Sequence, residues 1–277
     1  MVSIRTELKA HGLIPRKGLG QHFLVDRNVM NKVVEAAQVD EGDIVLEVGP
    51  GLGEMTVVLA DRVRKIIAVE IDPKLAKILK NKMDRYPNVE VIREDILKID
   101  LRQFRKAGAQ RIKVVANLPY QISTPLLFRF IEVREVFCSL TLMLQKEVAE
   151  RLVALPGGKE YGPLSIFVQM FSDVSICFHV KPSAFFPPPK VESAVIRMSW
   201  KDRPAVAIED EEWFKKVVKG AMGYRRKTLM NALKHSGLVL PGASEVRLRG
   251  AGIDPQRRSG TLTLQEFARL AELLKQP

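Results

Sequence analysis

Apolar, β-branched runs alternate with stretches of helical spacing between residues 44 and 200, and this alternation restricts the possible folds most strongly. Helices are predicted between most of the runs, at Met55–Val63, Pro73–Met83, Thr124–Val133 and Lys146–Leu155. Strands joined by helices form right-handed crossovers, so we expect an α/β fold with a Rossmann-like, seven-stranded, mostly parallel sheet and helices on both faces. The predicted strands are Ile44–Val48, Lys65–Ile71, Val89–Asp95, Ile112–Leu118, Ser139–Gln145, Val174–Val180 and Ser193–Trp200.

One connection breaks this alternation. The segment Lys181–Lys190 is rich in proline and too short for a crossover helix, so the last two strands are expected to be an antiparallel pair at the sheet edge. Strand patterns stop after Trp200, and later segments predict helices. We therefore expect a domain at residues 1–202, with an N-terminal arm at 1–25, and a helical domain at 203–277. The helices predicted there are Glu209–Met222, Arg225–Lys234 and Leu262–Leu274.

A glycine-rich loop follows the first predicted strand. Its glycines are Gly49, Gly51 and Gly53, a spacing in which the third glycine comes one residue too early for the dinucleotide pattern G-x-G-x-x-G. Pro50 also removes a backbone N–H that a pyrophosphate would need. The loop therefore predicts close approach of the backbone to a ligand with little or no phosphate.

Acidic residues close the next two strands. Glu70, followed by Ile71, is placed to accept hydrogen bonds from both hydroxyls of a ribose. Asp95 is placed to accept one from an adenine amino group, with Ile96 packing on the ring. A glycine loop, a ribose acceptor and an adenine acceptor on three consecutive strand ends favour S-adenosylmethionine as cofactor. A Rossmann dehydrogenase is the alternative, although the glycine spacing and Pro50 argue against it.

The fourth strand runs into Asn117-Leu118-Pro119-Tyr120. The Asn117 side-chain oxygen and the Leu118 carbonyl are suited to accept hydrogen bonds from the two N–H groups of an exocyclic adenine amine. The ring of Pro119 fixes the backbone angle φ between these two acceptors and Tyr120. Tyr120 offers a face for stacking. Phe185 is the candidate for the other face, or else a core aromatic of an edge strand. Such catalysis depends on positioning and preorganised electrostatics, so no Ser/His/Asp set is required.

Basic residues exceed acidic ones, and the net charge of +12 favours nucleic acid or an anionic membrane surface as partner. Between Trp213 and Lys234 the chain has no acidic residue, which favours phosphate contact over an ordinary solvated helix face. Arg16 and Lys17 are a second, weaker candidate contact. The basic residues of the run are Lys215, Lys216, Lys219, Arg225, Arg226, Lys227 and Lys234.

Several classes of protein are disfavoured. No apolar run is long enough to span a membrane, and the N-terminus lacks the apolar core of a signal peptide, so a cytoplasmic location is expected. The two cysteines lack metal-ligand spacing, so no metal site is expected. Nothing in the sequence indicates an oligomer, and a monomer is the default expectation.

Short sequence motifs, or blocks, along nearly the whole chain occur in the same order as in a known family. By these motifs the chain resembles the ribosomal RNA adenine dimethyltransferases, of the bacterial type that acts on small-subunit rRNA. The fold implied is that of the class I methyltransferases that use S-adenosylmethionine, followed by a helical RNA-binding domain. The blocks are Gly18–Leu24, Glu47–Gly53, Val69–Asp72, Asn117–Pro125, Met143–Leu152, Pro182–Ser193, Tyr224–Leu229 and Gly252–Pro255.

The resemblance implies transfer of four methyl groups to two adjacent adenosines near the 3′ end of 16S rRNA, in an assembling small subunit (a 30S precursor). It implies that Asn117, Leu118 and Tyr120 hold the target amine and that Phe185 stacks on the base. The cofactor-contacting positions that it implies are His22, Leu24, Gly49, Glu70, Asp95 and Asn117.

The chain departs from the family pattern at His22 and at Gln121, where asparagine is commonest in both cases. With histidine at position 22, the family's side-chain contact to the cofactor is not expected to be kept in the same form. Glutamine at position 121 keeps the amide group on a side chain that is one methylene longer. Two other functions remain open: an RNA-binding assembly factor without activity, and a related methyltransferase that gives macrolide resistance through large-subunit rRNA. The blocks Arg225–Leu229 and Gly252–Pro255 favour the small-subunit enzyme.

Overall fold

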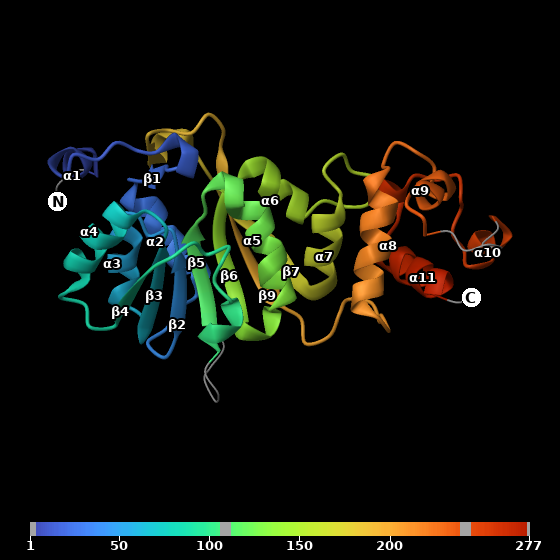
Figure 1. The fold of residues 1–277 in the computed structure, drawn as a ribbon, viewed down its shortest axis with the longest axis horizontal. Helices are drawn as coiled ribbons and strands as arrows, with labels where there is room; N and C mark the ends of the chain where they lie inside the picture. Colours follow the sequence, from blue (N-terminus) through green and yellow to red (C-terminus); the bar gives the residue numbers. More distant parts are fainter. Residues whose placement is uncertain (1–3, 106–111, 239–244, 276–277) are drawn as a thin grey trace. The chain divides into compact units, whose positions relative to one another are not determined.

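The structure is a computed structural model that describes residues 4–105, 112–238 and 245–275. Its main feature is a seven-stranded sheet with the order β4-β3-β2-β5-β6-β9-β7 (Figure 1). Neighbouring strands from β4 to β6 run parallel, which confirms the predicted crossovers. The strands are β2 (Ile44–Val48), β3 (Lys65–Glu70), β4 (Val89–Arg93), β5 (Ile112–Asn117), β6 (Phe137–Gln145), β7 (Ser172–Val180) and β9 (Ser193–Trp200).

The reversal of direction occurs at β9. This strand pairs antiparallel with β6, from Ser139 opposite Ser199 to Gln145 opposite Ser193, and lies between β6 and the edge strand β7. The proline-rich link before it contains a short strand, β8 (Phe185–Phe186), which pairs antiparallel with β1 (Phe23–Leu24). This two-stranded ribbon fastens the N-terminal arm to the link.

The chain divides into two compact units, and the first contains residues 1–149 and 175–200. Within it, apolar side chains of three helices, including Val33, Leu59 and Leu79, form one cluster with residues of the central strands, such as Val45 and Val115. The helices of this unit are α1 (Ile4–Ala10), α2 (Arg27–Ala37), α3 (Glu54–Ala60), α4 (Pro73–Met83), α5 (Tyr120–Glu132) and the start of α6 (Lys146–Leu152). Short 3-10 helices are η1 (Lys17–Leu19), η2 (Leu101–Phe104), η3 (Arg134–Val136) and η4 (Pro182–Ala184).

Aspartates begin two of these helices. Asp26 accepts hydrogen bonds from the backbone N–H groups of Asn28 and Val29 at the start of α2, and Asp72 does the same for the first turn of α4. Pro73 occupies the first position of α4, where its missing N–H costs nothing. Both caps lie at the end of the sheet where the parallel strands finish.

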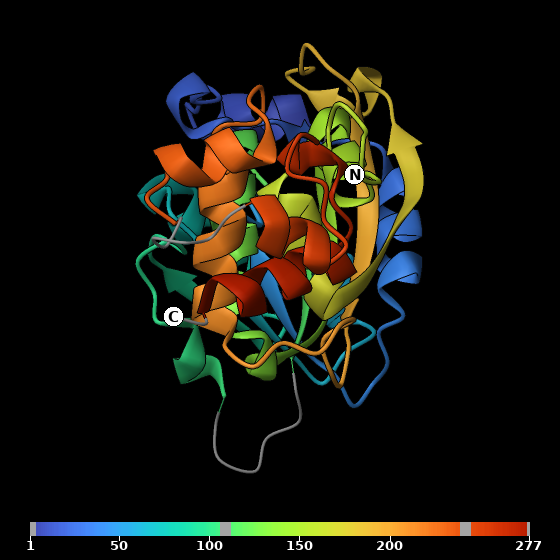
Figure 2. The same ribbon diagram turned by 90° about the vertical axis from the view of Figure 1, so that its right-hand side faces the viewer.

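The second unit contains residues 150–174 and 201–277, and apart from the start of β7 its regular elements within the described residues are helices joined by loops (Figure 2). It includes a segment, 150–174, that the sequence analysis assigned to the first domain. The reason is that α7 is mostly apolar and buried and packs on α8, with the rings of Phe167 and Phe214 6.3 Å apart. The helices are α7 (Pro163–Phe171), α8 (Glu211–Gly223), α9 (Leu229–His235), α10 (Glu245–Gly250) and α11 (Leu264–Lys275), with η5 (Ser259–Thr261).

Candidate functional site

A pocket opens at the carboxyl ends of β2, β3 and β5, the edge at which open α/β sheets bind ligands. It is bounded by the N-terminal arm, by the glycine loop and by the turns that follow the strands. The structure brings together all but one of the residues predicted for the cofactor and the target amine. The predicted residues that line the pocket are His22, Leu24, Gly49, Gly51, Glu70, Ile71, Asp95, Ile96, Asn117, Leu118, Pro119 and Tyr120.

The glycine loop has a backbone that other residues would strain. Gly49, Gly51 and Gly53 have φ values of +68°, +62° and +81°, in the left-handed region. A side chain at Gly51 would also stand 3.0 Å from the Phe23 ring. The Gly49 N–H donates to the Val69 carbonyl at 2.9 Å, which ties the loop to β3. The loop is therefore a preformed surface of bare backbone.

Glu70 is fixed by backbone donors at the end of β3. Its two carboxyl oxygens accept hydrogen bonds from the N–H groups of Gly51, at 3.0 Å, and Asp72, at 2.9 Å. Burial raises the pKa of Glu70, and these hydrogen bonds oppose the rise. Each oxygen keeps acceptor capacity for a ligand hydroxyl, because a carboxylate oxygen has two lone pairs.

Glu47 lies one step deeper, on the central strand β2. Side chains alternate along strands, and the register places Glu47 on the same face as Glu70 and Asn117. It is 1% exposed, and neither of its oxygens has a hydrogen-bond partner among the described residues. Burial raises its pKa to about 8; the nearby Thr56 hydroxyl lowers it without completing a hydrogen bond of normal geometry, and the Glu70 charge adds to the rise. The sequence analysis named Glu47 only as the start of a block.

The loop after β4 holds the two residues predicted to contact an adenine. Asp95 is partly buried, and one of its carboxyl oxygens accepts the Leu97 N–H at 3.0 Å. Ile96 is buried, and its carbonyl accepts a hydrogen bond from Arg129 of α5 at 2.6 Å. This brace from α5 keeps the loop folded toward the pocket.

Asn117 ends β5 with its amide oriented. Its side-chain N–H donates to the His22 carbonyl at 3.0 Å, so the oxygen of the same amide is left as the acceptor for a ligand. The N–H of Leu118 donates to the Met143 carbonyl at 3.1 Å, which anchors the turn to β6. The Tyr120 hydroxyl hydrogen-bonds to the Ser193 hydroxyl at 2.8 Å.

The two departures from the family pattern have contacts of their own. The His22 ring stacks on Tyr120 with centroids 5.7 Å apart, and its Nδ1 lies 2.7 Å from the Pro187 carbonyl. The longer arm of Gln121 reaches the Gly18 carbonyl at 3.2 Å, which a shorter amide side chain would not span. Both side chains hold the N-terminal arm against the motif at Asn117.

Phe185 differs from its expected position. It is 4% exposed, belongs to the core cluster and is not among the residues that line the pocket. In the short ribbon Phe185 pairs with Leu24, and because neighbouring strand residues face opposite sides, Phe186 faces away from this cluster and packs on a smaller apolar cluster that includes Leu8 and Leu52. Phe185 is thus placed as a core aromatic, and its stacking on a base stays a prediction.

A family model described as ribosomal RNA adenine dimethylase matches residues 14–276. The chain belongs to this family. The Ribosomal RNA small subunit methyltransferase A of Alkaliphilus oremlandii is 48% identical over 262 residues, covering 93% of this chain and 91% of that protein. The protein of the same name from Geobacter metallireducens is 46% identical and covers 96% of this chain and 98% of its own length.

Two crystal structures are similar over most of their length. A dimethyladenosine transferase from Plasmodium falciparum superimposes with a TM-score of 0.74 at 28% identity, covering 90% of this chain and 96% of that one. The 23S rRNA methyltransferase ErmE superimposes with a TM-score of 0.67 at 26% identity, covering 92% and 100%. With the strand order above, these likenesses confirm the predicted methyltransferase fold.

The second unit carries the basic run that was predicted to contact RNA. Arg225, Arg226 and Lys227 are exposed in the turn between α8 and α9. Arg225 donates to the Lys159 carbonyl at 3.1 Å, and the Lys227 ammonium lies 3.0 Å from a His235 ring nitrogen. The Arg226 guanidinium has no hydrogen bond or ion pair recorded among residues 4–105, 112–238 and 245–275.

The lysines of α8 differ from one another. Lys215 forms ion pairs with Glu211 and Glu212, both at 2.9 Å, so acidic residues just before the basic run already neutralise it. Burial alone would lower the Lys215 pKa, but the hydrogen bonds and charges of the two glutamates outweigh it and raise the pKa. Lys216 lies over the Trp213 ring at 5.3 Å and is exposed, as is Lys219. The case for phosphate contact is therefore weakest at Lys215.

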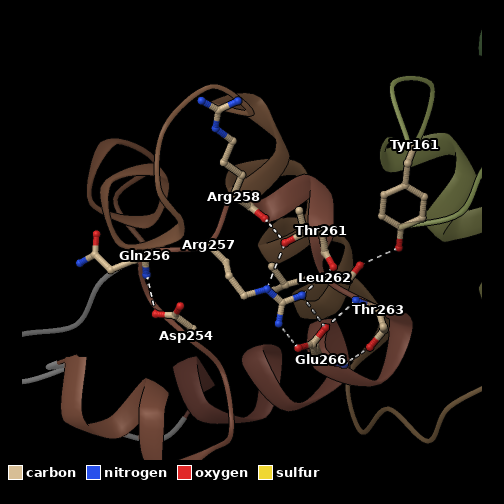
Figure 3. Close-up of polar contacts among 9 residues, drawn as sticks. All are labelled: Tyr161, Asp254, Gln256, Arg257, Arg258, Thr261, Leu262, Thr263 and Glu266. Atoms are coloured by element: carbon tan, nitrogen blue, oxygen red, sulfur yellow. Dashed lines mark hydrogen bonds and ion pairs between the residues drawn. The ribbon is translucent and has the colours of Figure 1, made fainter. Parts of the chain in front are cut away.

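A loop after α10, held by polar contacts of Arg257 (Figure 3), carries a further exposed arginine. Arg257 forms an ion pair with Glu266 and donates to the Thr261 carbonyl at 2.7 Å, which fixes the loop after α10. Arg258, exposed and next in sequence, forms a β-bridge with Thr228 beside the basic turn. The sequence analysis missed Arg258 because the arginine pair is distant in sequence from the basic run.

Features of other protein classes are not seen. No helix within the described part of the chain is long and apolar enough to cross a bilayer. Histidine, cysteine and carboxylate side chains do not gather into a metal-binding group anywhere in residues 4–105, 112–238 and 245–275.

Proposed function

We propose that this protein uses S-adenosylmethionine to dimethylate the N6 atoms of two adjacent adenosines near the 3′ end of 16S rRNA. Four methyl groups are transferred, and the substrate is the assembling small subunit in the cytoplasm. The observation that carries this proposal is the oriented Asn117 amide, whose oxygen faces a pocket with a glycine cradle in a chain of the rRNA adenine dimethylase family.

The pocket has the donors and acceptors that S-adenosylmethionine requires. The glycine loop presents backbone without side chains, and Glu70, already held by two N–H groups, accepts the ribose hydroxyls. Asp95 and Ile96 suit the amino group and the face of the adenine. Among the described residues no lysine or arginine lines the pocket, in keeping with a cofactor that carries no phosphate. When bound, the cofactor supplies an electrophilic methyl group.

The target amine is then positioned by the motif at the end of β5. An adenine amine is a poor nucleophile because its lone pair is delocalised into the ring. The Asn117 oxygen and the Leu118 carbonyl accept its two N–H groups, which favours a pyramidal nitrogen with the lone pair free to attack. Tyr120, held by Ser193, supplies a stacking face for the extruded base. The rate enhancement comes from positioning and fixed dipoles.

The small subunit is favoured as substrate by the relatives. The curated proteins named for the small ribosomal subunit are 42% to 48% identical, whereas ErmE, named for 23S rRNA, is 26% identical. The exposed arginines at 225, 226 and 258 form a basic surface suited to phosphate contact.

Mapping the modified nucleosides tests the proposal. Purified protein and labelled cofactor are mixed with either unmethylated small subunits or naked large-subunit rRNA. We expect N6,N6-dimethyladenosine at two adjacent positions of small-subunit rRNA. Label only in large-subunit rRNA would refute the substrate, and no label in either would favour an assembly factor without activity.

The docking surface is tested separately. Replacing Arg225 and Arg226 with Ala is expected to weaken rRNA binding and to lower the salt dependence of log K by roughly one per lost phosphate contact. The control replaces Arg62 and Arg64, two exposed arginines just before β3, at the opposite edge of the sheet from the pocket. An unchanged salt dependence of log K in the variant without Arg225 and Arg226 would refute phosphate contact by these two arginines.

A further inference from the structure

A second hollow lies on the first unit beside the cofactor pocket. It has a volume of about 740 Å³, within the range of sites that hold small molecules or nucleotides. Its apolar part includes Val25, Val57 and Phe186, and it is also lined by arginines 5 and 27, from α1 and α2, and by arginine 85, from the turn after α4. We call this hollow the arginine groove. None of its residues was assigned a role by the sequence patterns.

The charge of the arginine groove is positive and uncompensated at the arginines. Arg5, Arg27 and Arg85 are exposed, and none forms an ion pair within the described ranges of the chain. The fourth cation of the groove, Lys82, is neutralised, because it binds Glu54 at 2.6 Å and Glu7 at 3.4 Å. The groove thus presents three guanidinium groups and one paired lysine.

The apolar part of the groove is also unusual for a surface. Val25 is 41% exposed, and Phe186 is only partly buried, with the Arg5 guanidinium 5.8 Å from its ring centroid. An aromatic ring beside arginines matches surfaces that bind nucleic acid, where bases or riboses pack on rings while arginines hold phosphates in bidentate pairs.

The groove is separated from the cofactor pocket by a single ribbon. Phe23 lines the pocket, and its partner in the β1–β8 register, Phe186, lines the groove. Ile4, Met30 and Glu54 border both hollows. A strand of RNA that delivers a base to the pocket therefore has the groove within one ribbon width of its path.

We propose that the arginine groove binds the RNA backbone next to the target adenosines. The three guanidinium groups hold phosphates, and Phe186 with its valine neighbours packs against a ribose or base. This inference rests on the proposed function, and it adds a contact on the catalytic unit to those on the helical unit. RNA is favoured as the occupant over an acidic peptide because the groove joins three arginines, unpaired within the described residues, to an aromatic ring and borders a pocket proposed to receive a base of the same strand.

The first test removes the charges. A triple variant, Arg5→Gln with Arg27→Gln and Arg85→Gln, is compared with Arg62→Gln/Arg64→Gln, which removes arginine charge at the opposite sheet edge. We expect the triple variant to bind unmethylated small subunits about tenfold more weakly near 0.1 M salt, and its salt slope to fall by roughly two to three. KM for the subunit should rise with kcat little changed, and binding of S-adenosylhomocysteine to the free protein should be unchanged. The control variant should match the wild type in each measurement.

The second test identifies the occupant. A photo-crosslinking phenylalanine analogue at Val25 is irradiated in the complex with unmethylated small subunits, and adducts are mapped. We expect adducts on rRNA nucleotides near the target adenosines. Adducts on a ribosomal protein alone, or binding of the triple variant with the affinity of the wild type, would refute the proposal that the arginine groove binds RNA. Wild-type protein that binds subunits but methylates nothing would overturn the proposed activity instead, so the two failures are distinguishable.

Discussion

The buried carboxyl of Glu47 is expected to make the stability of this protein depend on pH, and Glu47→Gln should remove its share of that dependence. Glu47 sits on the central strand with neither oxygen hydrogen-bonded among the described residues, and burial raises its pKa to about 8. Glutamine has nearly the same shape and carries no titrating proton. The substitution therefore tests the burial of this group without emptying its place in the core.

The sign follows from proton binding. The unfolded chain releases this proton near its ordinary pKa of 4.5, whereas the folded protein retains it up to about pH 8. Between those values the unfolded state binds fewer protons, so the free energy of unfolding falls as pH rises. At about 1.4 kcal/mol per pH unit, the loss between about pH 5 and 7.5 is about 3 kcal/mol. Below pH 4.5 both states hold the proton and the loss vanishes.

Urea titrations of wild type and Glu47→Gln, followed by circular dichroism across this pH range, measure the effect. Any fixed cost of the amide is the same at each pH and cancels from the slope. We expect the free energy of unfolding of the variant to gain about 3 kcal/mol relative to wild type between about pH 5 and 7.5. Glu41→Gln, at an exposed position, should follow the wild type. Parallel curves for wild type and Glu47→Gln would refute the reasoning.

Three further predictions concern single contacts. Asn117→Ala should lower the rate of methyl transfer about 10²- to 10³-fold in single-turnover assays while still binding S-adenosylhomocysteine in calorimetry; full activity would dismiss the mechanism. Gly51→Ala should weaken cofactor affinity in the same calorimetry, because φ is +62° and the new methyl meets an aromatic ring, whereas Gly223→Ala, outside the pocket and with open space, should bind normally. Arg257→Met leaves Glu266 buried without its cation, and should lower the free energy of unfolding by about 3 kcal/mol. A second substitution, Glu266→Gln, should restore part of that loss in thermal or chemical unfolding; no loss in the single variant would mean the pair is not stabilising.

The sheet was predictable because parallel strands buried on both faces have continuous apolar sequences, as at Ile44–Val48 and Ile112–Asn117. The helix Pro163–Phe171 was missed for a related reason: it is buried nearly all round, so its sequence has no polar face and no clear helical period. The ribbon of Phe23–Leu24 with Phe185–Phe186 escaped prediction because two-residue strands carry no pattern.

The site was predictable in position and less so in detail. A residue that ends a parallel strand must reach the carboxyl edge, which located Glu70 and Asn117 without coordinates. Contacts between distant segments follow no local pattern, so the His22 ring on Tyr120 was not foreseen. Phe185 shows most clearly what local sequence does not predict. Its place in the motif indicated stacking on a base, whereas pairing with Leu24 in the short ribbon places its side chain in the core.

Apolar packing of Ile4 and Leu8 and a set of polar contacts together attach the N-terminal arm to the site. His22 accepts from Asn117 through its carbonyl, Arg16 pairs with Asp72 at 3.4 Å, and Gln121 holds the Gly18 carbonyl. The Asn117 contact fixes the side-chain amide so that its oxygen is left as the acceptor for the target amine. The position of the arm and the orientation of this amide are therefore set by the same hydrogen bond.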